Sequence, residues 1–258
     1  MLKTKECLLV FFLGVGLFFT SSNVFAQDES STQKGGILKD LNIPLEVSVD
    51  TAISSKYIWR GFTLDDDTVV QPGIYVSAYG FTASVWGSFE IQSNDALSSS
   101  EIDYSLDYTH DFGKFSLSLG NTYYDFPAVD AFSNELYFGV GVDIFLSPSL
   151  VFYHDYGREE DGGGHGEYLV LNLSHSLPLG SRGIMLDLGG HVGYNHKLFI
   201  NGEGGDVAFN IGVSIPLTDK ITFTPNVNYS IPFGDMKAAD DGNQDSKFYG
   251  GFKLVFGF

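Results

Sequence analysis

Several histidine and aspartate residues lie close enough in the sequence to suggest acid–base chemistry. His154 and Asp155 are adjacent, and His165 follows in the next polar segment. A hydrolase needs a carboxylate pair, or a serine beside a base, at a single site. Neighbours along a strand point to opposite faces, so His154 and Asp155 cannot share a site unless a bulge intervenes. We therefore expect a protein that is not an enzyme, with a hydrolase at the rim of the fold as the weaker alternative.

Other candidate sites are weaker still. Asp103 and Asp107 share a face but lie ~13 Å apart at the rise of a strand, too far to share a proton. His191 and His196 are separated by an odd number of positions and so face opposite sides, which argues against a metal site. The glycine-rich segment 162–166 lacks the strand–helix context and the lysine of a phosphate-binding loop. We expect no catalytic residue, no cofactor and no metal.

The segments that position these residues alternate between apolar and polar side chains. From Lys114 to Tyr124, for example, Phe115, Leu117 and Leu119 alternate with serine and glycine. This period of two is typical of a strand with one apolar and one polar face. Twelve such segments are predicted, at 45–61, 69–79, 81–91, 101–111, 114–125, 134–146, 149–157, 166–177, 183–196, 206–217, 220–232 and 247–258.

The connections predict how the strands are arranged. Five tight turns alternate with six longer polar loops, as periplasmic turns alternate with external loops in outer-membrane barrels. The fold class predicted is all-β, a transmembrane antiparallel up-and-down β-barrel of about 12 strands. We expect no external loop to fold far inward, since the longest covers only 233–246.

The strands of a soluble two-sheet sandwich would also alternate between apolar and polar side chains, and this is the main competing fold. Its edge strands usually carry charges or proline, whereas the apolar face here is nearly unbroken. Large aromatic residues also concentrate toward strand ends, as in the interfacial belts of membrane barrels. The expected external belt contains Tyr57, Trp59, Phe89, Tyr123, Tyr194, Tyr229 and Phe248, and the periplasmic one Phe81, Phe115, Phe223, Phe256 and Phe258.

The first residues indicate export. Lys3 and Lys5 precede an apolar run and a small-residue cleavage site at Ala26, the pattern of a signal peptide. We expect residues 1–26 to be removed after export through the Sec pathway, 27–44 to form a flexible periplasmic leader and 45–258 to form the barrel. Cys7 is the single cysteine, so the mature chain would contain no disulfide.

The charge balance limits the partners. The formal net charge is −18, and it becomes −19 once Lys3, Lys5 and Glu6 leave with the signal peptide. A nucleic-acid-binding surface must be basic, so nucleic acid is excluded as a partner. A strongly acidic channel would instead favour cations over anions.

Charged residues on the polar faces are candidates for lining the barrel interior, because the same charges facing lipid would cost a few kcal/mol each. Two roles stay open for them, packing of a filled wall or lining of a narrow pore. The candidates are Glu46, Asp50, Lys56, Arg60, Glu90, Asp103, Asp107, Asp143, Asp187, His191 and Lys253.

The last strand resembles the C-terminal recognition strand of bacterial outer-membrane proteins. Phe252, Leu254, Phe256 and the terminal Phe258 share one face. The resemblance implies that these four residues are the membrane-insertion signal read by the outer-membrane insertion machinery.

A stretch of about forty residues carries a family resemblance. SSKYIWRG at 54–61, QPGI at 71–74 and VWG at 85–87 resemble the start of the TorF-type porins, a proteobacterial family formerly described as conserved proteins of unknown function. The resemblance implies a barrel and its location rather than a substrate.

These observations predict a channel in the outer membrane of a Gram-negative bacterium. We expect passive diffusion of small hydrophilic solutes with a mild preference for cations. The expected partners are outer-membrane lipid, lipopolysaccharide and the solutes themselves. The alternative is a non-conducting structural or adhesive barrel, plugged by the charges of its own lumen.

Overall fold

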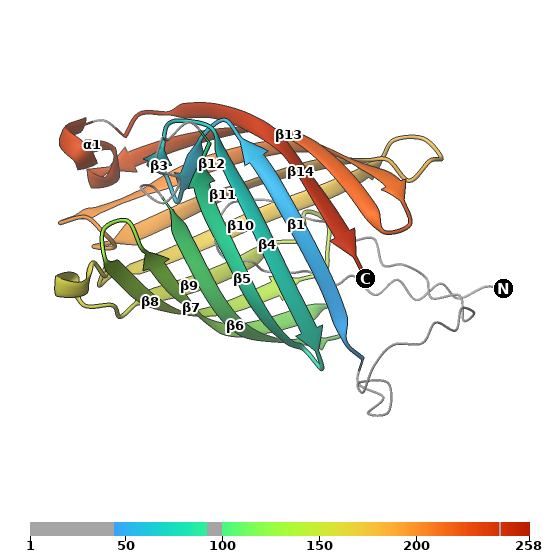
Figure 1. Cartoon of the computed structure of the whole chain (residues 1–258), viewed down its shortest axis with the longest axis horizontal. Helices are drawn as coiled ribbons and strands as arrows, with labels where there is room; N and C mark the ends of the chain where they lie inside the picture. Colours follow the sequence, from blue (N-terminus) through green and yellow to red (C-terminus); the bar gives the residue numbers. More distant parts are fainter. Residues whose placement is uncertain (1–43, 92–99, 243) are drawn as a thin grey trace.

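Twelve antiparallel strands close into a single barrel (Figure 1). The structure is a computed structural model that describes residues 44–91, 100–242 and 244–258. Each strand of the ring pairs with the next ring strand along the chain, and the last pairs with the first. The predicted up-and-down barrel is therefore confirmed. They are β1 (Glu46–Ser54), β4 (Val69–Ala78), β5 (Phe81–Glu90), β6 (Glu101–Phe112), β7 (Phe115–Phe126), β8 (Ala131–Val142), β9 (Ser149–Asp155), β10 (Glu167–Pro178), β11 (Met185–His196), β12 (Glu203–Thr218), β13 (Ile221–Gly234) and β14 (Lys247–Gly257).

The ring closes between the first and last strands. β1 pairs with β14 from Ser48 opposite Gly257 to Ser54 opposite Gly251. The terminal Phe258 adds a backbone hydrogen bond of 3.0 Å from its N–H to the carbonyl of Val47. Closure satisfies the backbone groups of both strands and removes the exposed edges that an open sheet would present.

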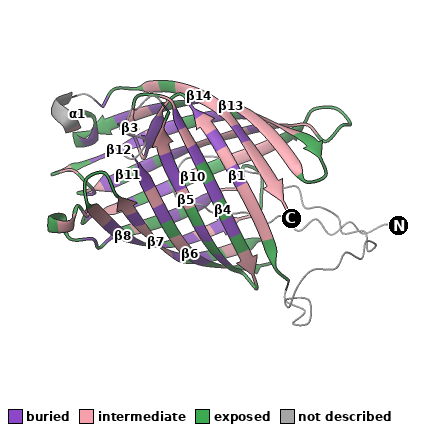
Figure 2. Ribbon diagram, in the orientation of Figure 1, coloured by how far each residue is buried: buried purple, intermediate pink, exposed green. Residues whose placement is uncertain are grey.

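The faces of the barrel are the reverse of those of a soluble protein. On β6, Leu106 is 57% exposed on the outside, while Asp103 and Asp107 are buried on the inside. This alternation of exposed and buried residues runs along the strands in Figure 2. The apolar exterior and the closed ring rule out the soluble sandwich.

The two ends of the barrel differ in their connections. One end carries the turns 79–80, 113–114, 143–148, 179–184 and 219–220. At the other end lie the described residues 55–68, 91, 100, 127–130, 156–166, 197–202, 235–242 and 244–246, which include the short helices η2 (Glu159–Asp161) and α1 (Asp235–Gly242). We name these the turn end and the loop end. Figure 1 shows α1 and the C-terminus at opposite ends.

One predicted loop is shorter than expected. β8 begins at Ala131 rather than at 134, and its pairing with β7 continues up to Ala131 opposite Phe126. The connection therefore covers only 127–130. None of the helices in the described part of the chain is long and apolar enough to cross a membrane.

The predicted first strand, 45–61, is interrupted. β1 ends at Ser54, and the chain then forms β2 (Tyr57–Trp59) and β3 (Phe62–Asp65), a separate two-stranded sheet. Arg60 and Gly61 connect them with positive φ angles of 48° and 85°, the backbone signature of a tight two-residue hairpin turn. We call residues 55–68 the inner hairpin.

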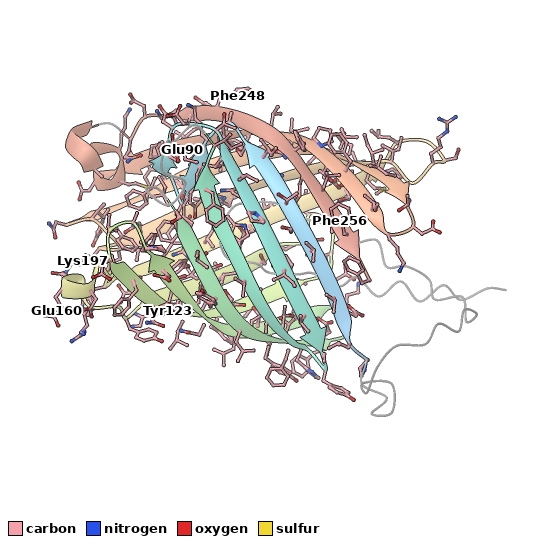
Figure 3. The ribbon with its side chains drawn as sticks, in the orientation of Figure 1. Glu90, Tyr123, Glu160, Lys197, Phe248 and Phe256 are labelled. Atoms are coloured by element: carbon pink, nitrogen blue, oxygen red, sulfur yellow. The ribbon has the colours of Figure 1, made fainter. Side chains whose placement is uncertain are left out.

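Aromatic residues mark both ends of the barrel exterior. Figure 3 places Phe248 and Phe256 toward opposite ends of β14, and Phe115 and Phe258 are exposed at the turn end. Tyr57 and Trp59 are exceptions, since both are buried on the inner hairpin. Their prediction as part of the external belt is wrong because they leave the barrel wall with the hairpin.

The predicted signal peptide and all but the last residue of the predicted leader, together with Cys7, lie outside the described residues. They stay predictions.

The apolar exterior predicts a depth-dependent penalty for charge. Leu106→Arg, midway along β6, is expected to destabilise the barrel by about 2–4 kcal/mol in lipid, because arginine would face hydrocarbon. Phe112→Arg, on the same face at the turn end, is expected to cost about 0–1 kcal/mol. Denaturant unfolding in lipid vesicles measures both values. Equal losses at the two positions would contradict a membrane-facing exterior.

Candidate functional site

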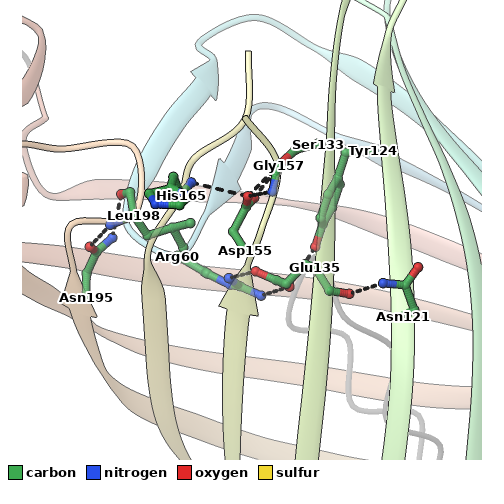
Figure 4. A network of polar contacts seen from close by, with 10 residues as sticks. All are labelled: Arg60, Asn121, Tyr124, Ser133, Glu135, Asp155, Gly157, His165, Asn195 and Leu198. Atoms are coloured by element: carbon green, nitrogen blue, oxygen red, sulfur yellow. Dashed lines mark hydrogen bonds and ion pairs between the residues drawn. The ribbon is translucent and has the colours of Figure 1, made fainter. Parts of the chain in front are cut away.

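The inner hairpin crosses the barrel interior. Arg60, at its tip, donates two hydrogen bonds to Glu135 of β8, with Nη1 to Oε2 at 2.6 Å and Nη2 to Oε1 at 2.7 Å. β8 lies almost opposite β1 in the ring, five strands away in one direction and seven in the other. Both side chains are buried, at 8% and 1% exposure. The ion pair therefore spans the interior, and Figure 4 shows it from close by. The prediction that no external loop folds inward is wrong.

Three aromatic rings surround the same guanidinium. Arg60 Cζ lies 4.0 Å from the ring centre of Tyr153, 4.5 Å from that of Trp59 and 4.7 Å from that of Tyr168. A cation over an aromatic face is stabilised by the ring quadrupole, more so away from water. Arg60 thus has both of the contacts that proteins use to recognise a planar cation, a forked carboxylate and aromatic faces.

Neighbouring strands hold this arrangement in place. Tyr124 of β7 donates a hydrogen bond of 3.0 Å to Glu135. Tyr168 of β10 donates one of 2.6 Å to Asp206 of β12, whose other oxygen lies 2.6 Å from Nε2 of His191. A carboxylate only accepts, so this contact places a proton on Nε2 of His191.

The loop end covers the hairpin with apolar side chains. Leu198 and Met236 are fully buried and belong to one cluster with Trp59 and Phe62. A side chain at Gly61 would come within 2.6 Å of the sulfur of Met236 and 2.7 Å of Cβ of Asp206. The tip of the hairpin is therefore packed tightly between α1 and the wall.

Asp155, one of the residues first considered for catalysis, anchors a loop. Its carboxylate accepts hydrogen bonds from Ser133 Oγ at 2.7 Å and from the backbone N–H groups of Gly157 and His165 at 2.9 and 3.2 Å. His154 is 46% exposed on the opposite face. The two side chains therefore do not meet, as the strand geometry predicts. No group of three metal-ligating side chains occurs among the residues that the structure describes.

The interior toward the turn end is lined by polar and charged residues. Lys253 of β14 pairs with Asp50 of β1 at 2.6 Å, next to the closing seam. Asp187 accepts hydrogen bonds of 2.6 Å from Ser176 and from Ser214. Ser176 and Ser214 are only partly buried. This half of the interior is thus more open to water than the half that holds the hairpin.

Carboxylates dominate the interior. Within the described ranges, the permanently charged cations on the inside are Arg60 and Lys253, each in an ion pair. One inward oxygen of Asp103 is buried without a hydrogen-bond partner. The buried acidic residues are Asp50, Glu101, Asp103, Asp107, Glu135, Asp155, Asp187 and Asp206. Such an excess creates a field that attracts cations.

The predicted lining residues fall into two groups. Asp50, Asp103, Asp107, Asp187, His191 and Lys253 are buried inside the barrel, and the Arg60 side chain joins them from the hairpin. The other four lie at the ends of the barrel. Glu46 and Asp143 are exposed at the turn end, since β8 stops at Val142, and Lys56 and Glu90 lie at the loop end, partly buried.

Lys56 pins the base of the hairpin. Its ammonium donates a hydrogen bond of 2.6 Å to Asp66, and Lys247 approaches the same carboxylate at 3.4 Å. The hydrogen bond from Lys56, aided by Lys247, holds the pKa of Asp66 below its ordinary value. Asp66 therefore stays ionised into mildly acidic solution.

Comparison with known families gives one match over most of the chain. Residues 40–229 match the model of Gcw_chp, described as a bacterial protein of unknown function. The chain belongs to this family. The narrower resemblance to TorF-type porins stays a prediction. No curated protein matches the sequence of this Gcw_chp member.

Solved structures share its fold at low sequence identity. The NanC porin is 10% identical with a TM-score of 0.51, covering 81% of this chain and 98% of its own. LpxR from Salmonella typhimurium is 10% identical with a TM-score of 0.50, covering 83% and 100%. The COG4313 outer membrane channel from Pseudomonas putida F1 is 12% identical with a TM-score of 0.44, covering 91% and 100%. The first two likenesses establish the fold of an outer-membrane barrel and leave the activity open.

The sequence contains a signal for the interior residues that the prediction left out. Glu135 has the same parity as Asp143 in the predicted strand 134–146, and Asp206 lies on the polar face of the predicted strand 206–217. Alternation would have placed both inside. The inward tyrosines, Tyr124, Tyr153 and Tyr168, also follow the parity of their strands.

The cross-lumen ion pair predicts a large cost for losing one partner. Arg60→Ala is expected to destabilise the folded barrel by about 3–5 kcal/mol, because Glu135 would stay buried without its cation. Arg60→Ala/Glu135→Gln should cost clearly less than the two single variants added together. Arg158→Ala is the matched control. Arg158 forms ion pairs at 69% exposure, and such pairs contribute about 0–1 kcal/mol.

Urea unfolding of the four variants in lipid vesicles gives these free energies. Additive losses in the double variant would contradict a direct coupling across the interior.

Proposed function

We propose that this protein is an outer-membrane channel for small hydrophilic solutes, narrowed at its loop end by the inner hairpin. The observation that carries the proposal is the hairpin itself. A loop that enters the lumen and pairs with the far wall is a constriction, and constrictions with charged side chains determine which solutes pass. The location in the outer membrane rests on the barrel fold and its apolar exterior.

The interior favours cations. Its buried carboxylates, which include Asp50, Glu135, Asp187 and Asp206, outnumber its permanent cations, Arg60 and Lys253. A low-dielectric wall strengthens such a field. We therefore propose passive diffusion with a preference for cationic solutes, without a catalytic step.

A second candidate is a barrel that does not conduct. It is favoured by the tight packing at the loop end, where Trp59, Phe62, Leu198 and Met236 form one buried cluster. In that case the hairpin would be a permanent plug, and the loops would provide the working surface. The two candidates differ in whether unseating the hairpin opens a path for ions.

The proposed channel predicts that Gly61→Val raises single-channel conductance severalfold in planar bilayers. A valine side chain at this position would clash with Met236 and Asp206, so the tip would leave its seat while every wall residue is retained. The reversal potential in a salt gradient should move toward that of the cation. Wild-type protein should conduct less, with the same sign of selectivity.

Gly113→Val is the matched control. Gly113 also has a positive φ, +70°, and an added Cβ there meets nothing within 4 Å, so the backbone strain is similar without the clash. Its conductance should equal that of the wild type. Flat traces for wild type and Gly61→Val at every voltage would rule out the channel and support the non-conducting barrel.

A further inference from the structure

The contacts of the Arg60 guanidinium are those of a bound ligand. Two N–H groups point at one carboxylate at 2.6 and 2.7 Å, and the rings of Tyr153 and Tyr168 lie 4.0 and 4.7 Å from its carbon. A forked carboxylate fits the planar guanidinium better than any other biological cation. Aromatic faces are the second common element of cation recognition.

Apart from Trp59, the residues named here around the Arg60 guanidinium belong to the barrel wall rather than to the hairpin. We call Tyr124, Glu135, Tyr153 and Tyr168 the guanidinium box. Glu135 is held by Tyr124, and Tyr168 is held through Asp206 by His191, with each bond between different strands. These bonds do not involve Arg60. The box is therefore preorganised by the wall, which lowers the cost of binding a free ligand.

Arg60 itself is attached by a short hairpin turn. It lies in the two-residue tip between β2 and β3, with a φ of 48°. Because the seated hairpin holds Arg60 beside Glu135, a free cation must compete with a tethered one, and displacing it needs a higher concentration than filling an empty box. The geometry matches a site occupied by a tethered mimic of its ligand.

We propose that the guanidinium box is a binding site in the lumen for solutes bearing a guanidinium group, which Arg60 occupies while the hairpin is seated. A solute that takes the place of Arg60 pairs with Glu135 and stacks on Tyr153 and Tyr168. The substrate class of the channel is then guanidinium compounds. This consequence for transport rests on the proposed channel function, whereas binding to the box does not.

Isothermal titration calorimetry of the Arg60→Ala protein in detergent micelles tests the proposal without a bilayer. Guanidinium chloride at constant ionic strength should bind saturably in the millimolar range, since the box is vacated. Urea, planar but neutral, should give no saturable signal. Ammonium should bind about tenfold more weakly, the equivalent of ~1.4 kcal/mol, because it cannot form the forked pair.

The same titration of a double variant and of the wild type tests whether guanidinium binds at the box. Arg60→Ala/Glu135→Gln retains the rings but removes the charge, and should lose saturable guanidinium binding. Wild-type protein should need at least tenfold more guanidinium, because Arg60 competes. Equal binding to Arg60→Ala with and without Glu135, or the absence of saturable binding to a folded Arg60→Ala barrel, would overturn the proposal.

Folding of the variant is itself informative. If Arg60→Ala fails to fold alone, refolding with millimolar guanidinium should restore the barrel, and equimolar urea should not. Failure of guanidinium to improve refolding would count against the site. Binding without any conductance in Gly61→Val would retain the box and remove the channel, whereas conductance without binding would retain the channel and remove the box.

Discussion

Ring closure is the constraint on which the rest of this structure depends. A backbone surrounded by lipid has no water to satisfy its N–H and C=O groups, so the strands must pair all the way around. Pairing of β1 with both β4 and β14 achieves this, and it forces residues 55–68 out of the wall. Ser54 pairs directly with Val69, so the intervening chain must leave the ring. It turns into the lumen, where Tyr57, Trp59 and Phe62 find an apolar seat under Leu198 and Met236.

The inward hairpin changes what the interior can be. In a wide pore, Arg60 and Glu135 would lie too far apart to pair, and each charge would act on passing solutes separately. Here Arg60 and Glu135 satisfy each other across the barrel, and the surrounding rings exclude water from the pair. Toward the turn end, the serine partners of Asp187 are only partly buried. The barrel is therefore asymmetric along its axis, tightly packed at the loop end and more open toward the turn end.

Alternation along the strands was enough to predict the barrel and much of its interior. A period of two assigns each side chain to a face, and Asp50, Asp103, Asp107, Asp187, His191 and Lys253 are accordingly buried inside. The hairpin could not be predicted in this way. Tyr57 to Arg60 continues the alternation of the first strand, and only the positive φ angles at Arg60 and Gly61 reveal the turn. The pairing of Arg60 with Glu135, 75 positions away, depends on ring closure, which local patterns do not encode.

The energetics of the ion pair bear on whether the hairpin can move. Desolvating two charges costs nearly as much as their attraction returns, so a buried pair contributes little net stability, although losing one partner is costly. The apolar cluster around Trp59 therefore supplies most of the free energy that holds the hairpin in the lumen. The Arg60–Glu135 pair determines where along the wall the tip of the hairpin binds. A second cation beside Glu135 would replace the lost partner and cancel the penalty for unseating Arg60. A solute of that charge and shape would thus lower the barrier to opening, whereas a neutral solute of the same size would not.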